Sequence, residues 1–446
     1  MRPARHTEKS NHPHARPPRR FRGKQPPAPM TRRSPPGVRP PEGRGGPRRH
    51  DVAVPAGTAG QNQRELQPQP VDRPGLKVVE GILELTNKGF GFLRNPAKSF
   101  QPLPGDPYVS NAIVDRFRLQ GGLKLTGKID PNQPSPNGGG PRLLALDLIE
   151  DKEPSLYTPR DFDSLTPIDP HVWLRLETGS QPLTTRVMDL LTPIGKGQRG
   201  LIVAPPRSGK TVLLQHIALA VAQNYPEMKI VVLLVDERPE EVTDMKRTVK
   251  GDVFASSSDQ DSEQHVRLAQ IVFERAKRLA EQGEEVFLLL DSLTRLARAY
   301  NKEVGTSGRT MTGGIDVHAM EIPKRLFGAA RVFEEGGSLP ILGTSLVETG
   351  SKMADIIFQE FKGTGNMELV LDRKLADRRI YPAIDIPQSG TRKEEKLLPK
   401  DNLKFITLMR RVLAGMKPIE AMTLLVDKLN LTKTNDEFMD QVRTKW

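Results

Sequence analysis

The sequence of 446 residues lacks cysteine altogether and contains only two tryptophans. Without cysteine, disulfide bonds and thiolate-bound zinc are excluded, and a reducing compartment such as the cytoplasm is the expected location. No run of about eighteen apolar residues occurs, so we expect no membrane-spanning helix and no membrane partner. The N-terminal residues also lack the apolar stretch of a secretory signal, which supports the same cytoplasmic location.

Acidic and aromatic residues are scarce over residues 1–75, which hold 16 Lys+Arg, 5 Asp+Glu and a single aromatic residue, Phe21. The remaining 371 residues hold 51 Lys+Arg and 49 Asp+Glu, so the net charge of +13 belongs almost entirely to this N-terminal segment. So few apolar side chains cannot offset the entropy lost on ordering, and we predict a disordered basic extension rich in Pro, Arg and Gly. Two roles stay open for it: a cationic arm that binds phosphate backbones, and a solubilising extension.

Residues 76–152 consist of short apolar segments separated by Gly, Pro and Asn, a pattern typical of a small all-β barrel. Strands are expected within KVVEGILELTNKGFGFLRN, PYVSNAIVDRFRL, LKLTGKID and RLLALDLIED. In KGFGFLR, the side chains of Phe90, Phe92 and Arg94 share one strand face because side chains alternate along a strand. Two Phe at this spacing are usually core residues, but they also match the exposed, base-stacking aromatics of OB and cold-shock barrels.

Residues 153–184 are expected to form a linker, and strand–loop–helix units follow over residues 185–446. Near-continuous apolar runs such as GLIVA, KIVVLLVDE, EVFLLLDS and LPILGTSLVE alternate with helical patterns such as SEQHVRLAQIVFERAKRLAEQG. Strands that are apolar on both faces are typical of a parallel sheet covered by helices. We therefore predict an α/β domain after the barrel.

The stretch LIVAPPRSGKTVLLQ has the frame of a phosphate-binding P-loop between an apolar strand and a helix. In such a loop, backbone N–H groups surround the phosphates, Lys reaches the β- and γ-oxygens, and Ser or Thr binds Mg²⁺. Ala204 stands where the usual pattern has its first glycine, whereas the second glycine, Gly209, is kept. A chance Gly-Lys-Thr is the alternative, and the flanking strand and helix disfavour it. The expected nucleotide-binding residues of the loop are Pro206, Arg207, Ser208, Gly209, Lys210, Thr211 and Val212.

Carboxylates end two further apolar strands. Asp291 closes VFLLLD, and Asp236 and Glu237 close VVLLVDE, directly before Arg238, a further expected nucleotide contact. Ligands of open α/β sheets bind at the carboxyl ends of the strands, so these side chains are expected beside the P-loop. We predict that Asp291 binds Mg²⁺ through water and that Glu237, favoured over Asp236, polarises the attacking water. An isolated Asp would more often cap a helix, but three strand ends converging on one triphosphate indicate an NTPase.

Motifs along most of the chain resemble the Rho family of transcription termination factors. They include RVMDLLTPIGKGQRGLIVAPPRSGKT, VVLLVDERPEEVTDM, LLLDSLTRLARAYN, PKRLFGAARVFEEGGSL, EFKGTGNMELVLDRKLADRRIYPAIDIPQSGTRKEE and TKTNDEF. The resemblance runs from residue 76 to the C-terminus and is far more specific than the P-loop alone. It implies a homohexameric ring of RecA-like P-loop ATPase domains that uses ATP and Mg²⁺ to pull single-stranded RNA through its centre.

The resemblance implies specific roles at the nucleotide site. Lys210 and Thr211 would bind phosphate and Mg²⁺. Glu237 would be the catalytic carboxylate and Asp291 the Walker B acid. Arg207 falls where the family usually has lysine in the loop.

Further roles fall on the segment DRRIYPAIDIPQSGTRKEE. Arg392 would be an arginine finger that reaches the nucleotide of the neighbouring subunit, assisted by Arg379. Tyr381 would stack on the adenine. A finger supplied by the next subunit permits hydrolysis only in an assembled ring, which couples the reaction to subunit motion.

For RNA, the resemblance makes the barrel the primary site and assigns secondary contacts to two loops, EVGTSGRTMTGG and VETGSKMAD. The expected RNA contacts are Phe90, Phe92, Arg94 and Phe100 in the barrel, and Arg309 and Lys352 in the loops. The family usually has a small helical bundle before the barrel, and the pattern of residues 1–75 predicts none. Leu143 or Leu144 stands where a second aromatic is expected. We therefore expect RNA binding and leave the preferred base open.

The reading that we adopt is an RNA-dependent ATPase and 5′→3′ RNA translocase or helicase that releases transcripts from the RNA polymerase elongation complex. One alternative is a subunit of a rotary or export-type ATPase, which shares PIGKGQRG. A second is a RecA-type recombinase or ring DNA helicase, which would discriminate weakly between RNA and DNA. An RNA-binding protein with a degenerate ATPase is disfavoured because the expected catalytic side chains are all present.

Overall fold

The structure, a computed structural model, describes residues 75–135, 140–303, 310–311, 314–316 and 318–443. The basic extension predicted over residues 1–75 therefore lies almost wholly outside the described residues.

The first part of the described chain is a closed barrel with the strand order β1-β2-β3-β5-β4. Its strands are β1 (Lys77–Leu85), β2 (Gly91–Arg94), β3 (Tyr108–Val109), β4 (Lys124–Pro134) and β5 (Pro141–Ile149), with a 3-10 turn η1 (Pro96–Lys98) after β2. Alternating apolar residues such as Leu83, Leu93, Leu125 and Leu143 fill the interior. The expected all-β barrel is confirmed.

One segment expected to be a strand is instead partly helical. PYVSNAIVDRFRL forms the short strand β3 and then the helix α1 (Asn111–Phe117). Val114 is buried in the barrel core, and Ile113 and Phe117 pack against it. These positions are one, three and four residues apart and lie on one side of a helix, so the tertiary contact decides for helix.

Short strands and a helix join the barrel to the next domain. β6 (Pro167–Ile168) pairs with β15 (Arg331–Phe333), which also pairs with β16 (Ser338–Leu339). β7 (Trp173–Leu174) pairs with β8 (Ile194–Gly195), on either side of α2 (Leu183–Leu191). A separate pair is formed by β13 (Thr310–Met311) and β14 (Ile315–Asp316).

The second domain is built on a seven-stranded sheet with the order β11-β10-β12-β17-β9-β18-β19. All neighbouring strands are parallel except the last pair, β18 and β19. The strands are β9 (Arg199–Ala204), β10 (Lys229–Glu237), β11 (Asp252–Ser257), β12 (Val286–Asp291), β17 (Ile341–Leu346), β18 (Met367–Val370) and β19 (Gly390–Thr391). The predicted parallel α/β sheet is confirmed.

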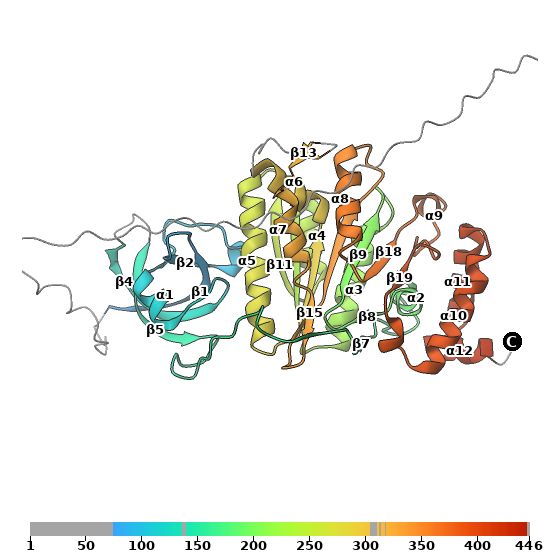
Figure 1. Ribbon diagram of the computed structural model, residues 1–446, viewed down its shortest axis with the longest axis horizontal. Helices are drawn as coiled ribbons and strands as arrows, with labels where there is room; N and C mark the ends of the chain where they lie inside the picture. The colour runs from blue at the N-terminus through green and yellow to red at the C-terminus, as the bar shows by residue number, and fades with distance from the viewer. Residues whose placement is uncertain (1–74, 136–139, 304–309, 312–313, 317, 444–446) are drawn as a thin grey trace, which may run out of the picture. The chain divides into compact units, whose positions relative to one another are not determined.

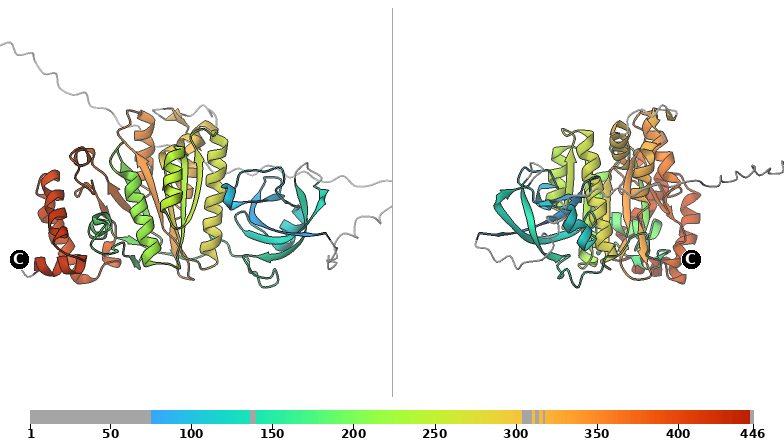
Figure 2. Two further views of the ribbon diagram at one scale, coloured as in Figure 1. Left: turned by 180° about the vertical axis from the view of Figure 1, so that it is seen from behind. Right: turned by 60° about the vertical axis from the view of Figure 1, so that its left-hand side comes forward.

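Helices cover both faces of this sheet (Figures 1 and 2). Along β9, Ile202 and Ala204 face one apolar cluster and Leu201 and Val203 face another. The first cluster is covered by α2, α3 (Lys210–Asn224), α4 (Pro239–Thr248), α9 (Arg373–Asp377), α10 (Lys400–Ala414), α11 (Pro418–Asn430) and α12 (Asn435–Arg443). The second is covered by α5 (Ser262–Glu281), α6 (Leu293–Glu303), α7 (Glu321–Phe327) and α8 (Lys352–Lys362), and two 3-10 turns complete the list, η2 (His318–Met320) and η3 (Glu394–Lys396).

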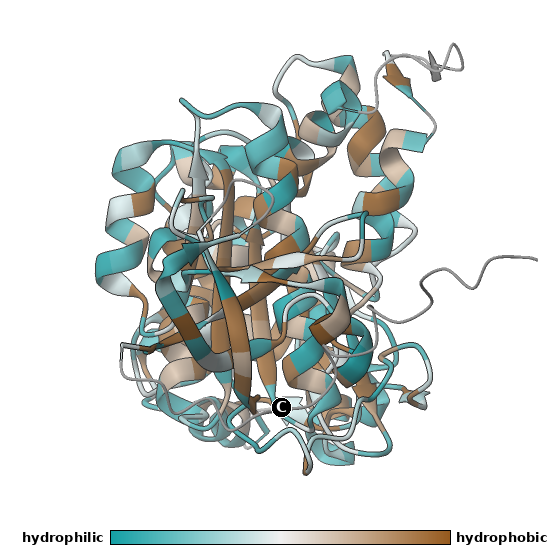
Figure 3. Cartoon of the chain, turned by 90° about the vertical axis from the view of Figure 1, so that its left-hand side faces the viewer, coloured by the Kyte–Doolittle hydropathy of each residue, from teal (hydrophilic) through white to brown (hydrophobic). Residues whose placement is uncertain are grey.

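The apolar residues follow this layering. In Figure 3 the central strands are largely brown, whereas the outer surfaces of the covering helices carry most of the teal, hydrophilic positions. Among the described residues, none of the helices combines the length and the apolar character needed to cross a bilayer.

Candidate nucleotide and RNA sites

The P-loop connects the carboxyl end of β9 to the first residue of α3. Gly209 precedes α3 with φ 91°, a backbone conformation that favours glycine, which explains why this glycine is kept. The hydroxyl of Ser208 donates to the carbonyl of Pro205 at 2.8 Å and closes the loop. Ala204 is the last residue of β9 and is fully buried in the core, so its position is decided by packing in the sheet.

Lys210 lies between two carboxylates from neighbouring strands. Its Nζ is 2.7 and 2.6 Å from the two carboxylate oxygens of Asp291 and 3.4 Å from Oε2 of Glu237. Burial alone would lower the pKa of Lys210, but the charges of Asp291 and Glu237 outweigh it and raise the pKa above its ordinary value. The lysine is therefore fully charged where phosphate is expected.

A bulge in β10 separates the roles of its two terminal carboxylates. The register with β11 shifts between Val235 and Glu237, and the intervening Asp236 has φ 55°. The extra residue redirects the strand, and Glu237 is buried while Asp236 is half-buried. Glu237 pairs with Lys210 and, at 3.2 Å, with Arg295 of α6.

Three residues that the sequence did not single out complete this cluster. Thr344 of β17 donates its hydroxyl to Oδ1 of Asp291 at 2.7 Å. Thr211 donates its hydroxyl to Oε2 of Glu241 at 3.2 Å. Thr344 and Arg295 could not be found from motifs, but Glu241 could have been, because it lies in the same RPEE turn as the candidate Glu237.

The donor set around Thr211 fits a magnesium ion that arrives with a nucleotide. Thr211 supplies a hydroxyl, and Asp291 and Glu241 supply carboxylates nearby. Within the described residues no group of three or more His, Cys, Asp or Glu could hold a metal by itself. Mg²⁺ usually takes one or two protein ligands and completes its shell with phosphate and water.

The remaining nucleotide candidates are exposed side chains around the P-loop. A Cβ built on Gly209 would lie 3.4 Å from Cε1 of Tyr381, so this ring stands beside the P-loop, with 44% of its surface exposed. Arg379, two residues earlier, is exposed and has φ 59°. The other exposed candidates around the loop are Pro206, Arg207, Val212 and Arg238.

Arg392 lies at the opposite end of the sheet from its own P-loop. Its backbone N–H donates to the carbonyl of Asn366 at 2.9 Å, and Asn366 binds Arg199 at the amino end of β9. The length of β9, about 17 Å at about 3.3 Å per residue, therefore separates the two. Tyr381 and Arg379 follow the carboxyl end of β18, so the expected pair Arg379 and Arg392 is not brought together within one chain.

The guanidinium of Arg392 stands in a cationic environment. Among the described residues, it has no hydrogen-bond or ion-pair partner, and it is exposed. Burial, then the nearby charges of Arg331 and Arg392, lower the pKa of Arg199. Arg331 itself pairs with Asp163 at 3.1 Å, so the charges left to favour an anionic partner from another molecule are those of Arg199 and Arg392.

On the barrel, three aromatic rings form one cluster. The ring centroids are 5.8 Å apart for Phe90 and Phe92, 5.3 Å for Phe90 and Tyr108, and 5.9 Å for Phe92 and Tyr108. Phe90 and Phe92 are half-buried, so each ring keeps an accessible part, whereas Tyr108 is buried. Arg94 lies over the Phe92 ring at 4.8 Å. The sequence did not indicate Tyr108.

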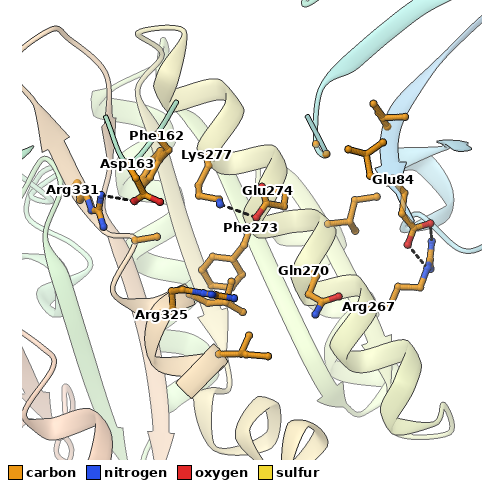
Figure 4. A pocket seen from close by; sticks show the side chains of 18 residues that line it. Glu84, Phe162, Asp163, Arg267, Gln270, Phe273, Glu274, Lys277, Arg325 and Arg331 are labelled. Atoms are coloured by element: carbon orange, nitrogen blue, oxygen red, sulfur yellow. Dashed lines mark hydrogen bonds and ion pairs between the residues drawn. The ribbon is translucent and has the colours of Figure 1, made fainter. Parts of the chain in front are cut away.

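The barrel contacts the α/β domain through α5. Arg267 donates to the two carboxylate oxygens of Glu84 at 2.6 and 2.8 Å, and Arg275 pairs with Glu150. A pocket of about 500 Å³ opens beside this contact, and Figure 4 shows the Glu84–Arg267 pair at one end and the Asp163–Arg331 pair at the other.

Comparison with known proteins agrees with this two-domain arrangement. Residues 79–155 match the family model of the Rho termination factor RNA-binding domain. Residues 184–391 match the nucleotide-binding domain of the ATP synthase alpha/beta family.

Curated relatives named transcription termination factor Rho decide the family. The protein of Pseudomonas aeruginosa is 52% identical over 82% of this chain and 88% of its own length. The chain belongs to the Rho family of transcription termination factors. The relative from Haemophilus influenzae is 50% identical over 81% of this chain and 87% of its own, and that from Salmonella typhimurium 49% over 82% and 87%. The chain is accordingly a transcription termination factor that joins an RNA-binding barrel to an ATP-hydrolysing domain.

Two solved ATPase structures share the fold at low sequence identity. An ATPase from the type III secretion system of pathogenic bacteria is 22% identical, with a TM-score of 0.55 over 69% of this chain and 94% of its own. An ATP synthase subunit from Nanoarcheaum equitans is 17% identical, with a TM-score of 0.52 over 69% and 82%. At these identities the likeness concerns the fold alone, and the alternative of a rotary or export ATPase is not favoured against Rho relatives near 50% identity.

Two of the expected RNA contacts of this Rho-family barrel need correction. Phe100 is fully buried and stacks on Phe254 with centroids 4.6 Å apart, so it is a core residue and not an exposed ring. Arg94 is nearly buried and pairs with Glu84 and Asp106 at 2.5 Å each, so its charge is already compensated. Arg94 followed from strand alternation and Phe100 from its place in the Rho-like pattern, and neither shows what packs against the side chain.

The loop candidates differ in what the structure says of them. Lys352 is exposed and is the first residue of α8, directly after the loop that follows β17. Arg309 lies outside the described residues.

Proposed function

We propose that the chain is an RNA-dependent ATPase that works as a homohexameric ring, moves 5′→3′ along nascent single-stranded RNA and releases transcripts from RNA polymerase. The observation that carries this proposal is the placement of Arg392, exposed and about the length of β9 away from its own P-loop. An arginine in this place can complete a nucleotide site only on a neighbouring copy. The proposed domains are the barrel over residues 76–152, the linker over 153–184 and the ATPase domain over 185–446.

In the proposed reaction, the γ-phosphate draws Lys210 away from Asp291 and toward the β- and γ-oxygens. Glu237, held between Lys210 and Arg295, is oriented to accept a hydrogen bond from the attacking water. Thr211 and Asp291 would hold Mg²⁺, which supplies neutralisation of the phosphate charge. Tyr381 stacks on the adenine, and Arg379 stands at the rim of the same site.

In the neighbouring subunit, Arg392 is offered to the transferring phosphoryl group. A guanidinium from another subunit stabilises charge that develops in the transition state, and such fingers contribute about 10³–10⁵-fold to the rate. The adjoining charge of Arg199 favours approach of the phosphates.

RNA is proposed to bind first on the Phe90 and Phe92 rings of the barrel and then at the centre of the ring. Base stacking on such rings tolerates many sequences. Lys352, exposed at the start of α8, would contact the phosphate backbone, and Arg309 is assigned the same role from its sequence position. The basic extension would add a salt-dependent contribution.

The first test of this proposal combines two inactive variants. Lys210→Ala removes the phosphate contact but keeps the finger, whereas Arg392→Ala removes the finger but keeps the P-loop. Each alone should hydrolyse ATP at least about 100-fold more slowly than the native protein. Mixed rings should regain part of the activity, because some interfaces then join an intact P-loop to an intact finger.

The mixed preparation needs two controls. Differently tagged subunits that co-purify establish that mixed rings have formed, and the native protein assayed with RNA, with matched DNA and without nucleic acid establishes the RNA dependence. Verified mixed rings without any recovered hydrolysis would contradict a finger that acts between subunits. Equal rates with and without RNA would contradict the RNA-dependent motor.

A further inference from the structure

The turn that carries Arg392 is held from several sides. We call residues 390–397 the finger loop. Thr391 donates its hydroxyl to the carbonyl of Pro193 at 2.7 Å, and the N–H of Arg392 donates to the carbonyl of Asn366. These contacts tie the loop to the ATPase domain on the amino-terminal side of Arg392.

On the other side of Arg392, the finger loop is held by the segment that arrives from the barrel. The two carboxylate oxygens of Asp169 each accept a hydrogen bond of 2.9 Å from Nζ of Lys393, and Oδ2 also accepts one of 2.6 Å from Lys396. One carboxylate thus bridges two lysines three residues apart, across the turn η3. The hydrogen bonds from Lys396 and Lys393 lower the pKa of Asp169 to about 2, so it is ionised at neutral pH.

Asp169 is itself fixed in position. Before it, β6 pairs with β15, and Thr166 donates its N–H and its hydroxyl to the carboxylate of Glu335. After it, the N–H of Lys196 donates to the carbonyl of Val172, and β7 pairs with β8. The carboxylate therefore stands between two anchored strands and can act as a fixed point for the finger loop.

Close packing at Gly195 shows that the two segments meet tightly. A Cβ on Gly195 would lie 2.6 Å from Cδ2 of Leu397 and 2.8 Å from Cβ of Pro170. Pro170 directly follows Asp169, and Leu397 ends the finger loop. Only a residue without a side chain lets both pack against β8 at once.

We propose that Asp169 is a positioning residue for the arginine finger. By holding Lys393, the residue next to Arg392, and Lys396, it orients the turn from which the guanidinium extends toward the neighbouring subunit. Lys393 also has φ 55°, a conformation unusual for a residue other than glycine. This inference rests on the proposed function of Arg392.

The contacts of Asp169 are better suited to orientation than to stability. All three side chains are substantially exposed, at 39% for Asp169, 59% for Lys393 and 46% for Lys396. Ion pairs at such exposure add little to folding stability because water screens them. Loss of the carboxylate should consequently loosen the turn without unfolding the domain.

The test is Asp169→Asn in the full-length protein, assayed for RNA-stimulated ATP hydrolysis. We expect kcat to fall about 10-fold, since a small displacement of a catalytic group has effects of this order. The KM for ATP, the RNA affinity, the thermal midpoint and the hexamer mass should stay as in the native protein. Asp169→Glu, which keeps the charge, should recover most of the lost kcat.

The matched control is Asp151→Asn. Asp151 is also exposed and accepts a hydrogen bond of 2.9 Å from a lysine, Lys124. This pair, however, lies in the barrel, between the start of β4 and the residues after β5. Its kcat should equal that of the native protein. An equal loss of kcat in this variant would overturn the inference, because the effect would then follow from any lost surface pair.

Combination with Arg392→Ala separates this inference from the function on which it rests. If Asp169 acts only through Arg392, the double variant should be no slower than Arg392→Ala. If Arg392→Ala is slow but Asp169→Asn is fully active, the role of Asp169 is overturned and the finger role of Arg392 stands. An active Arg392→Ala would instead contradict the finger itself, and a lowered thermal midpoint of Asp169→Asn that tracks its loss of kcat would make its role structural.

Discussion

The ammonium group of Lys210 lies 2.6 Å from the nearer carboxylate oxygen of Asp291, although 81 positions separate the two residues in the chain. Both side chains are largely removed from water, so each compensates the charge of the other. The same ammonium is proposed to bind phosphate, which means that ATP competes with Asp291 for it. Folding stability therefore depends on the intact pair, whereas catalysis depends on its exchange of Asp291 for phosphate.

Lys210→Ala should lower both the thermal stability of the protein and its rate of ATP hydrolysis. Within the part of the chain that the structure describes, it leaves the buried Asp291 carboxylate with the Thr344 hydroxyl as its one hydrogen-bond donor. An uncompensated buried charge costs about 3–5 kcal/mol. The thermal midpoint should fall and hydrolysis should be lost. The double variant Lys210→Ala, Asp291→Asn should recover the midpoint but not the hydrolysis, and failure to recover the midpoint would contradict the pairing.

Glu237→Gln should separate nucleotide binding from hydrolysis. The amide keeps the size of the side chain but cannot polarise water as a carboxylate does, so kcat should fall about 10²–10⁴-fold. Binding of a fluorescent ATP analogue should persist within a few fold. Asp236→Asn is the matched control one residue earlier and should keep most of the activity. If Asp236→Asn were the slower variant, the catalytic carboxylate would be misassigned.

Phe92→Ala should weaken RNA binding. Loss of one base stack costs about 1–3 kcal/mol, or about 5–150-fold in affinity for a single-stranded RNA measured by fluorescence anisotropy. Phe100→Ala is the contrasting variant, since Phe100 is fully buried against Phe254. It should lower the free energy of unfolding by about 3–5 kcal/mol and leave the RNA affinity of the folded protein unchanged. The opposite pattern would restore Phe100 as an RNA contact.

Asp189 should make stability depend on pH. Burial raises its pKa to about 7, against the hydrogen bonds donated by the backbone N–H groups of Leu176 and Glu177, which lower it. Because the folded pKa lies above the unfolded value of 3.8, the stability present below about pH 4 is lost as the pH rises toward about 7.

The check is the thermal midpoint of the native protein and of Asp189→Asn between pH 5 and about pH 8. The native protein should lose stability relative to the variant as the pH rises, with a slope on the order of 1.4 kcal/mol per pH unit below about pH 7. The quantity to compare is the slope of stability against pH and not the absolute stability, because asparagine changes the hydrogen bonds at every pH. Parallel profiles would show that Asp189 is ionised throughout.

The sequence alone determined features that depend on neighbouring residues or on long hydrophobic patterns. The P-loop could be predicted because the conformation of Gly209 and the strand–loop–helix order depend on neighbouring residues. The sheet could be predicted because strands such as VFLLLD are apolar on both faces. Asp291 and Glu237 could be placed beside the P-loop because parallel strands end at one edge.

Only the tertiary structure decided what each side chain meets. Phe100, Arg94 and Phe92 look alike as candidates in the sequence, but Phe254 covers the first and Glu84 and Asp106 neutralise the second. α1 is a helix because the barrel core receives its apolar side. Asp169 and Lys393 form a hydrogen bond although 224 positions separate them in the chain, and no sequence periodicity predicts such a pair. Contacts between distant segments depend on how the whole chain packs, and local propensity carries no record of them.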